Sequence, residues 1–282
     1  MKLGRMDHRT TAPIGDVLQF RPEFVILLLM ILVALWQPAG AQQPDTAPAA
    51  TQVGLTAEQV VHNLVQMNLC RAQALYAYRG TRTYRAEYRG FPSVRRAEMV
   101  VEVKYQSPGT KEFTIKSATG SKMIIDKVFK KLLQAEKEAL AAEAQRRIAL
   151  NGDNYDFILA GYDSTPFGSV YVLVVEPRTK DKFLYRGRIW VDARDFAVVR
   201  LEAEPAKNPS FWTKTAEIVQ TYMKVSDFWL PAHNHSVTAI RVGGRAELTI
   251  DYKGYEITSA GPMSSVLTLR STPHAATINA QK

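Results

Sequence analysis

Cysteine is nearly absent from this sequence, which has one Cys among 282 residues. A single cysteine cannot form a disulfide within the chain, so a disulfide-stabilised scaffold is excluded, and so is any site that needs two cysteines. Cys70 falls in a segment with helical periodicity. We therefore expect it to be a small buried apolar residue.

The common motifs of catalysis are also missing. The sequence has no glycine-rich phosphate loop, no metalloprotease helix and no serine elbow. The one pattern with metal-ligand spacing is His233-Asn234-His235, which places two imidazoles on one face of a strand. Because no third ligand is recognisable nearby, we expect surface histidines, no cofactor and no enzymatic activity. A metal site, and with it an enzyme, is the alternative.

Long hydrophobic runs are scarce. Phe24 to Trp36 is a continuous apolar run, but it falls short of the ~20 residues that span a bilayer. Basic residues precede it and Ala39-Gly40-Ala41 follows, which is the pattern of a secretory signal cleaved before Gln42. We therefore predict a signal peptide over residues 1–41 and an exported protein. An uncleaved anchor is the alternative.

Positive charge is in excess, with a formal net charge of +9 at pH 7. In an exported protein this excess does not indicate a nucleic-acid partner. An ordinary solvated surface fits best, and contact with anionic membranes or acidic proteins comes next.

What the sequence does contain is alternation with a period of two. In Phe183 to Ala203, apolar and charged residues alternate along two segments, which is typical of a β-hairpin with one buried face. A loop of Asp192 to Phe196, begun by an Asx-turn at Asp192, keeps Arg200 away from the apolar partners. This register pairs Val191 with Ala197, Ile189 with Val199 and Gly187 with Leu201, and it places Tyr185, Ile189, Val199 and Leu201 on the buried face.

Similar alternation recurs along the chain and predicts about ten antiparallel strands. Two helices complete the pattern. The first starts at Thr56, with Gln59 placed for a capping box, and runs to about Tyr78. The second spans Asp126 to Leu150 and has one apolar side, with Glu136 among the charged residues of its other side. A two-residue turn at Gly243-Gly244 joins the last two strands.

The chain divides into four predicted parts. These are the signal (1–41), a disordered leader (42–54), one domain (55–260) and a flexible tail (261–282). A single sheet of ten strands would curl strongly, and its concave face must be covered. With only two helices to cover it, the domain would leave an apolar interior space. The alternative is that the two helices complete a dry core.

Taken together, these segments resemble the LolA/LolB-like superfamily, in particular its outer-membrane lipoprotein-sorting proteins. The opening helix (VVHNLVQMNLCRAQAL), the SPG turn before KEFTI and the segment WVDARDFAVVRLE carry the resemblance. It covers nearly the whole chain after residue 41. It implies an incomplete β-barrel with helical lids around an apolar cavity that receives acyl chains. Two departures are the length and charge of the second helix and the absence of a lipidated N-terminal cysteine.

The resemblance implies a non-enzymatic periplasmic carrier of lipoprotein acyl chains or phospholipid. We expect a monomer, with an inner-membrane donor and an outer-membrane acceptor as partners. A sensor or adaptor that docks on a membrane protein is the alternative. The cavity and lid residues implied are Tyr84, Tyr88, Met99, Val101, Val103, Tyr105, Val128, Phe129, Leu132, Leu133, Tyr185, Ile189 and Leu201.

Overall fold

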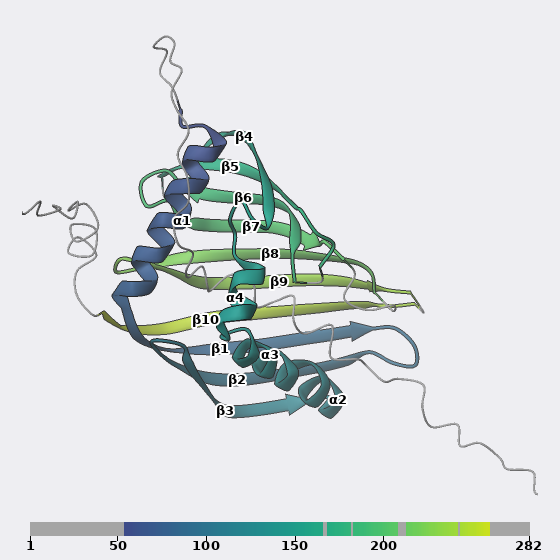
Figure 1. The fold of residues 1–282 in the computed structure, drawn as a ribbon. Helices are drawn as coiled ribbons and strands as arrows, with labels where there is room; N and C mark the ends of the chain where they lie inside the picture. The colour runs from purple at the N-terminus through teal and green to yellow at the C-terminus, as the bar shows by residue number, and fades with distance from the viewer. Residues whose placement is uncertain (1–53, 166–167, 182, 208–212, 242, 260–282) are drawn as a thin grey trace, which may run out of the picture.

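The structure is a computed structural model that describes residues 54–165, 168–181, 183–207, 213–241 and 243–259. Ten strands form one antiparallel sheet in the order β3-β2-β1-β10-β9-β8-β7-β6-β5-β4 (Figure 1). The predicted fold, a curled antiparallel sheet that is not closed into a barrel, is confirmed. The strands are β1 (Leu75–Arg89), β2 (Arg95–Gln106), β3 (Thr110–Gly120), β4 (Tyr155–Thr165), β5 (Gly168–Pro177), β6 (Tyr185–Asp192), β7 (Val198–Pro205), β8 (Thr213–Val225), β9 (Phe228–Ile240) and β10 (Arg245–Ser259).

The topology dictates the path of the second helical region. The chain leaves the sheet at one edge, β3, and re-enters it at the opposite edge, β4. The helical segment between these two strands must therefore cross the sheet, as Figure 1 shows. The meander from β4 to β10 then brings the chain back to β1, so that the last described strand pairs with the first.

The first helix, α1 (Ala57–Ala74), begins as predicted. The Thr56 hydroxyl accepts the Gln59 backbone N–H at 3.3 Å, and the Gln59 side chain accepts the Thr56 N–H at 2.9 Å, which completes the capping box. Cys70 is buried, also as predicted. The predicted end near Tyr78 is wrong, because β1 starts at Leu75 and Tyr78 faces the core from that strand. No helix among the described residues is long and apolar enough to span a membrane.

The second predicted helix, 126–150, is not continuous. It consists of α2 (Lys122–Ile124), a π-helical turn η3 (Ile125–Phe129), α3 (Lys130–Glu138) and α4 (Ala142–Ile148). Leu132 and Leu133 pack in one core cluster, whereas Ile148 packs in the other, against α1 and β4–β8. A straight helix does not follow a curved sheet between two such cores. The backbone therefore turns at Ala141, which is extended (φ −62°, ψ 135°).

Away from its bulge, the hairpin of β6 and β7 has the predicted faces, but its register differs. Ile189 lies opposite Leu201, and Gly187 lies opposite Ala203. The predicted pairs were wrong for two reasons: the loop is one residue longer, so that Val191 pairs with Val198, and a β-bulge next to Val191 shifts the ladder by one more residue. Tyr185, Ile189 and Leu201 are buried as expected. The prediction for Val199 is wrong, because at the bulge Val198 packs against this core and Val199 does not.

The backbone of β7 passes close to Gly187 of β6, which explains the glycine at this position. Gly187 has φ 151°, and a Cβ atom there would lie 2.1 Å from the carbonyl oxygen of Glu202. The glycine therefore lets the two backbones approach.

The turn between β6 and β7 connects the hairpin to α1. Asp192 Oδ1 accepts the backbone N–H groups of Arg194 and Asp195 at 3.0 and 2.7 Å, which confirms the predicted Asx-turn. Arg71, buried on α1, donates to the backbone carbonyls of Asp195 and Phe196. The turn is thus held by the helix that packs beside it.

The face of the sheet away from the helices, here called the outer face, is covered by ion pairs. Arg85 on β1 binds Glu98 on β2 at 2.8 Å and Asp251 on β10 at 2.6 Å. The predicted outward pair Arg200 and Glu202 is also an ion pair, and both side chains are partly exposed. Exposed pairs of this kind each contribute little to stability, so the outer face is solvated rather than packed.

The predicted signal, tail and leader, apart from Gly54, lie outside the described residues. The turn between β9 and β10 is longer than the predicted two residues, because β9 ends at Ile240 and β10 begins at Arg245. The Ile240 N–H donates to the Gly244 C=O across this turn.

Candidate functional site

The inner face of the sheet, which packs against the helices, carries one continuous row of buried residues. Each member lies directly opposite the next across neighbouring strands. From β2 to β5 the row is Met99, Tyr84, Ile250, Asn234, Gln220, Leu201, Ile189 and Leu173, all at most 3% exposed, with Gln220 and Leu201 paired between β8 and β7.

The row is apolar at both ends and polar in the middle. Asn234 Nδ2 donates to Gln220 Oε1 at 2.8 Å, and Asn234 Oδ1 is buried without a partner in the structure. This amide pair separates two apolar clusters. One lies on β1, β2, β9 and β10 under α2, η3 and α3, and the other lies on β4–β8 under α1 and α4.

The predicted cavity residues divide between these two clusters instead of forming one set. Tyr185, Ile189 and Leu201 lie in the cluster under α1. All the others except Tyr88 lie in, or pack against, the cluster under α3: Tyr84, Met99, Val101, Val103, Tyr105, Val128, Phe129, Leu132 and Leu133. Tyr88 belongs to neither. It lies near the end of β1, where its hydroxyl donates to the Phe91 carbonyl at 3.2 Å.

The apolar side of α3 and η3 is packed onto the sheet as predicted. Phe129, Leu132 and Leu133 are 0%, 4% and 7% exposed, and the Phe129 ring lies 5.7 Å from that of Tyr84. Sequence reasoning identified this side because its residues recur at helical spacing.

Sequence reasoning missed the charged cluster beneath α3. Glu136 on α3 binds Arg82 on β1 with both carboxylate oxygens, at 2.6 and 3.0 Å, and its Oε1 also accepts a hydrogen bond from Lys111 on β3 at 2.6 Å. All three residues are at most 8% exposed. The expectation that Glu136 lies on the solvated side of the helix is therefore wrong, because it continues the buried stripe one turn beyond Leu132 and Leu133.

A signal for Arg82 was present in the sequence. Alternation from Tyr84, which faces in, places Arg82 on the same face. Alternation with Phe113, two residues further along β3, likewise places Lys111 on the inner face.

Aromatic rings surround the two cations. The Arg82 guanidinium lies 5.0 Å from the centre of the Tyr252 ring and 5.8 Å from that of Phe113. Lys111 Nζ lies 5.7 and 5.8 Å from the ring centres of Tyr78 and Tyr105. Contacts between cations and ring faces gain strength where water is excluded, so the rings help to keep both charges inside the protein.

Glu136 and each of its two cations stabilise one another's ionised forms. Burial opposes ionisation of Glu136, but the attraction of Arg82 and Lys111 outweighs it and lowers the pKa of Glu136 to about 2. Burial likewise opposes the charge on Lys111, and the attraction of Glu136 outweighs it and raises the lysine pKa. The cluster therefore holds two cations and one anion at neutral pH.

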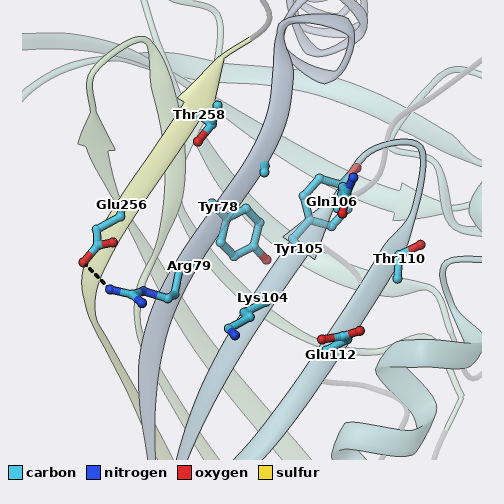
Figure 2. A pocket seen from close by; sticks show the side chains of 10 residues that line it. Tyr78, Arg79, Lys104, Tyr105, Gln106, Thr110, Glu112, Glu256 and Thr258 are labelled. Carbon is cyan, nitrogen blue, oxygen red and sulfur yellow. Dashed lines mark hydrogen bonds and ion pairs between the residues drawn. The ribbon is translucent and has the colours of Figure 1, made fainter.

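A pocket of about 380 Å³ lies on β1, β2, β3 and β10, and its lining includes Tyr78 and Tyr105 as well as charged residues. Arg79, Lys104, Glu112 and Glu256 are cross-strand neighbours that line it, and alternation places them on the face opposite Tyr78 and Lys111. Figure 2 shows the ion pair between Arg79 and Glu256 at 2.9 Å. Because side chains of both charge signs line this pocket, it does not match the apolar cavity that the resemblance implies.

The two histidines considered for a metal site have other partners. His233 Nδ1 lies 2.7 Å from Asp251 Oδ1, and His235 Nδ1 lies 3.4 Å from Thr249 Oγ1. Among the described residues, no group of three or more His, Cys, Asp or Glu side chains is arranged to hold a metal ion.

The sequence matches no family model and no curated protein. Solved structures that it resembles include a LolA superfamily protein from Nitrosomonas europaea, with 11% identity, coverage of 73% of this chain and 94% of that one, and a TM-score of 0.31. An outer membrane lipoprotein-sorting protein domain from Vibrio parahaemolyticus shares 10% identity over 76% and 98% of the two chains, with a TM-score of 0.37. MucB of Pseudomonas aeruginosa, solved with MucA, shares 10% identity over 75% and 96%, with a TM-score of 0.25. The superfamily to which the sequence pointed is thus among the structural neighbours. Similarity this distant carries no argument about function.

Proposed function

We propose that this protein is a non-enzymatic carrier that binds the acyl chains of lipoproteins or lipids and takes them across the periplasm toward the outer membrane. The observation that carries the proposal is the covered inner face. Apolar side chains line both ends of the sheet there, and a helical segment at one end buries Phe129, Leu132 and Leu133 against β1 and β2. An acyl chain would take the place of these side chains.

The energetics require such a cover. Moving an acyl chain from water into an apolar site gains about 0.8 kcal/mol of free energy per CH₂ group. Leaving a chain of ~16 carbons in water therefore costs on the order of 10 kcal/mol. A carrier must supply an equally apolar surface, and it must also release the chain. In this proposal the movable part is α3, because it lies between two breaks in regular α-helix, the π-helical turn Ile125–Phe129 and the extended residue Ala141.

The carrier must also meet a membrane, and the turn between β1 and β2 has the chemistry for it. Phe91 and Val94 are 89% and 52% exposed there. Arg89 and Arg96 flank them with largely exposed side chains that share one carboxylate, Glu87. An exposed aromatic residue beside surplus arginines fits the headgroup region of an anionic bilayer.

Native mass spectrometry of the exported protein, purified without detergent, tests the proposal. We expect a bound lipid or acyl mass, and a polypeptide mass that starts at Gln42. Copurification of a stoichiometric inner-membrane protein without lipid would favour the sensor or adaptor instead. A full-length polypeptide in the membrane fraction would show an anchored protein.

A further inference from the structure

The charged cluster beneath α3 carries one positive charge more than its own carboxylate neutralises. Arg82 and Lys111 face a single anion, Glu136, and the Lys111 side chain is 1% exposed. A buried surplus charge is costly unless a further partner compensates it. Lys111 has three N–H donors, of which the structure shows one bonded, to Glu136. The Tyr78 hydroxyl, whose ring lies beside this ammonium group, is buried without a partner in the structure.

On the helical segment that supplies the anion, apolar residues come first and the carboxylate last. Phe129, Leu132, Leu133 and Glu136 follow the spacing i, i+3, i+4, i+7, so they share one side of the helix. That side is an apolar stripe that ends in a carboxylate, and the carboxylate lies on two cations of the sheet. An anionic amphiphile likewise has an apolar part, its acyl chain, that ends in a negative charge, its head group.

We propose that Arg82 and Lys111 form the head-group site of an anionic amphiphile, which takes the place of Glu136 when α3 moves off the sheet. This inference rests on the proposed function and adds the ligand class to it. The acyl chain replaces Phe129, Leu132 and Leu133 on the inner face, and the carboxylate or phosphate of the head group replaces the Glu136 carboxylate. A neutral lipid would leave two buried cations without an anion, so the site selects against it.

The first experiment measures binding of cis-parinarate, a fluorescent fatty-acid anion, and of its neutral methyl ester to the mature protein. We expect the anion to bind at least tenfold more tightly than the ester, and Lys111→Met to reduce this ratio several-fold. Lys111→Met keeps the two-pronged pair of Arg82 and Glu136, so it leaves a neutral cluster. Lys116→Met, on the exposed outer face of the same strand, is the matched control and should leave the ratio unchanged.

The second experiment uses Glu136→Gln, which leaves both cations without their anion. We expect parinarate to raise the melting temperature of this variant by more than that of the wild type, whereas the methyl ester should raise both equally. Inorganic phosphate at the same concentration distinguishes a lipid head group from a free anion, and it should stabilise the variant less than parinarate does. If phosphate matches parinarate, the site serves free anions and the inference is wrong.

The outcomes separate this inference from the proposed function. If neither the acid nor the ester binds, the carrier proposal itself fails. If both bind equally well to the wild type and to Lys111→Met, acyl binding stands and the head-group site is refuted. Should Glu136→Gln fail to fold, the comparison of wild type, Lys111→Met and Lys116→Met still decides the question.

Discussion

Glu136 and Arg82 are joined by two hydrogen bonds, of 2.6 and 3.0 Å, although 54 residues of sequence separate them. The pair connects α3 to β1, and Lys111 adds β3 to the same carboxylate. The contact between the helix and the sheet therefore has an apolar part and an ionic part, and the ionic part responds to pH.

Acid should weaken the protein through Glu136. Its pKa in the folded state is about 2, below the ordinary value of 4.5 that applies in the unfolded chain. A lowered pKa stabilises the fold above pH 4.5, and this contribution is lost as the pH falls from there toward 2. Urea unfolding measured from pH 7 down to pH 2 should show that Glu136→Gln loses roughly 3–5 kcal/mol at neutral pH, and that its stability falls less steeply with acid than that of the wild type. An unchanged acid slope in the variant would contradict this assignment.

Leu201→Asp should destabilise the hairpin strongly. Leu201 is 3% exposed in the row of the inner face, and an unpaired charge there costs roughly 3 kcal/mol or more. Glu202→Ala, one residue further, removes only a partly exposed ion pair with Arg200 and should change stability by less than about 1 kcal/mol. Chemical denaturation of both variants tests the assignment of faces, which would be wrong if the two effects were equal.

Arg71→Ala should loosen α1 from the turn Asp192–Phe196. Its guanidinium donates to two backbone carbonyls of that turn and to Asn68 Oδ1 at 3.0 Å, so we expect a loss of about 1–3 kcal/mol. Arg79→Ala, which removes an exposed arginine from the outer face, is the control. Thermal melts that shift equally for both would show that the buried arginine does not hold the turn.

Phe129→Asp combined with Leu132→Asp should detach α3 without unfolding the sheet, because segments that move in function come from the low-stability end of a structure. We expect the β-sheet circular dichroism and a cooperative melt to persist. Binding of a fluorescent acyl probe should fall at least tenfold, about 1.4 kcal/mol. Gln134→Asp, on the exposed side of the same helix, should bind normally. A double variant that fails to fold would make the helix part of the core, and one that folds and binds normally would refute the lid.

Phe91→Ala should reduce binding to anionic vesicles. Its side chain is 89% exposed at the β1–β2 turn, so the substitution should leave the melting temperature unchanged. We expect vesicle cosedimentation to fall several-fold, since inserting the aromatic ring supplies the apolar part of the attachment. Equal cosedimentation of wild type and variant would place membrane contact elsewhere.

The sequence by itself determined which side of a strand faces the core, except at the bulge beside Val191. Alternation is a local property, so Ile189 and Leu201 could be assigned to the buried face, and Arg200 to the outer one, from their immediate neighbours. The capping box of Thr56 and the Asx-turn of Asp192 are local for the same reason, since each forms within four residues.

Only the tertiary structure decided which residues meet across distance. A loop one residue longer than predicted and the bulge beside Val191 together moved the register of the hairpin by two residues, and alternation could not reveal either change. The second helix is interrupted at Ala141, a place without glycine or proline. It is interrupted because the segment from β3 to β4 has to follow a curved sheet. Glu136 became buried for a related reason. A carboxylate on the core side of a helix is stable only where distant strands supply its cations, and the pairing that brings Arg82 and Lys111 together is a property of the whole sheet.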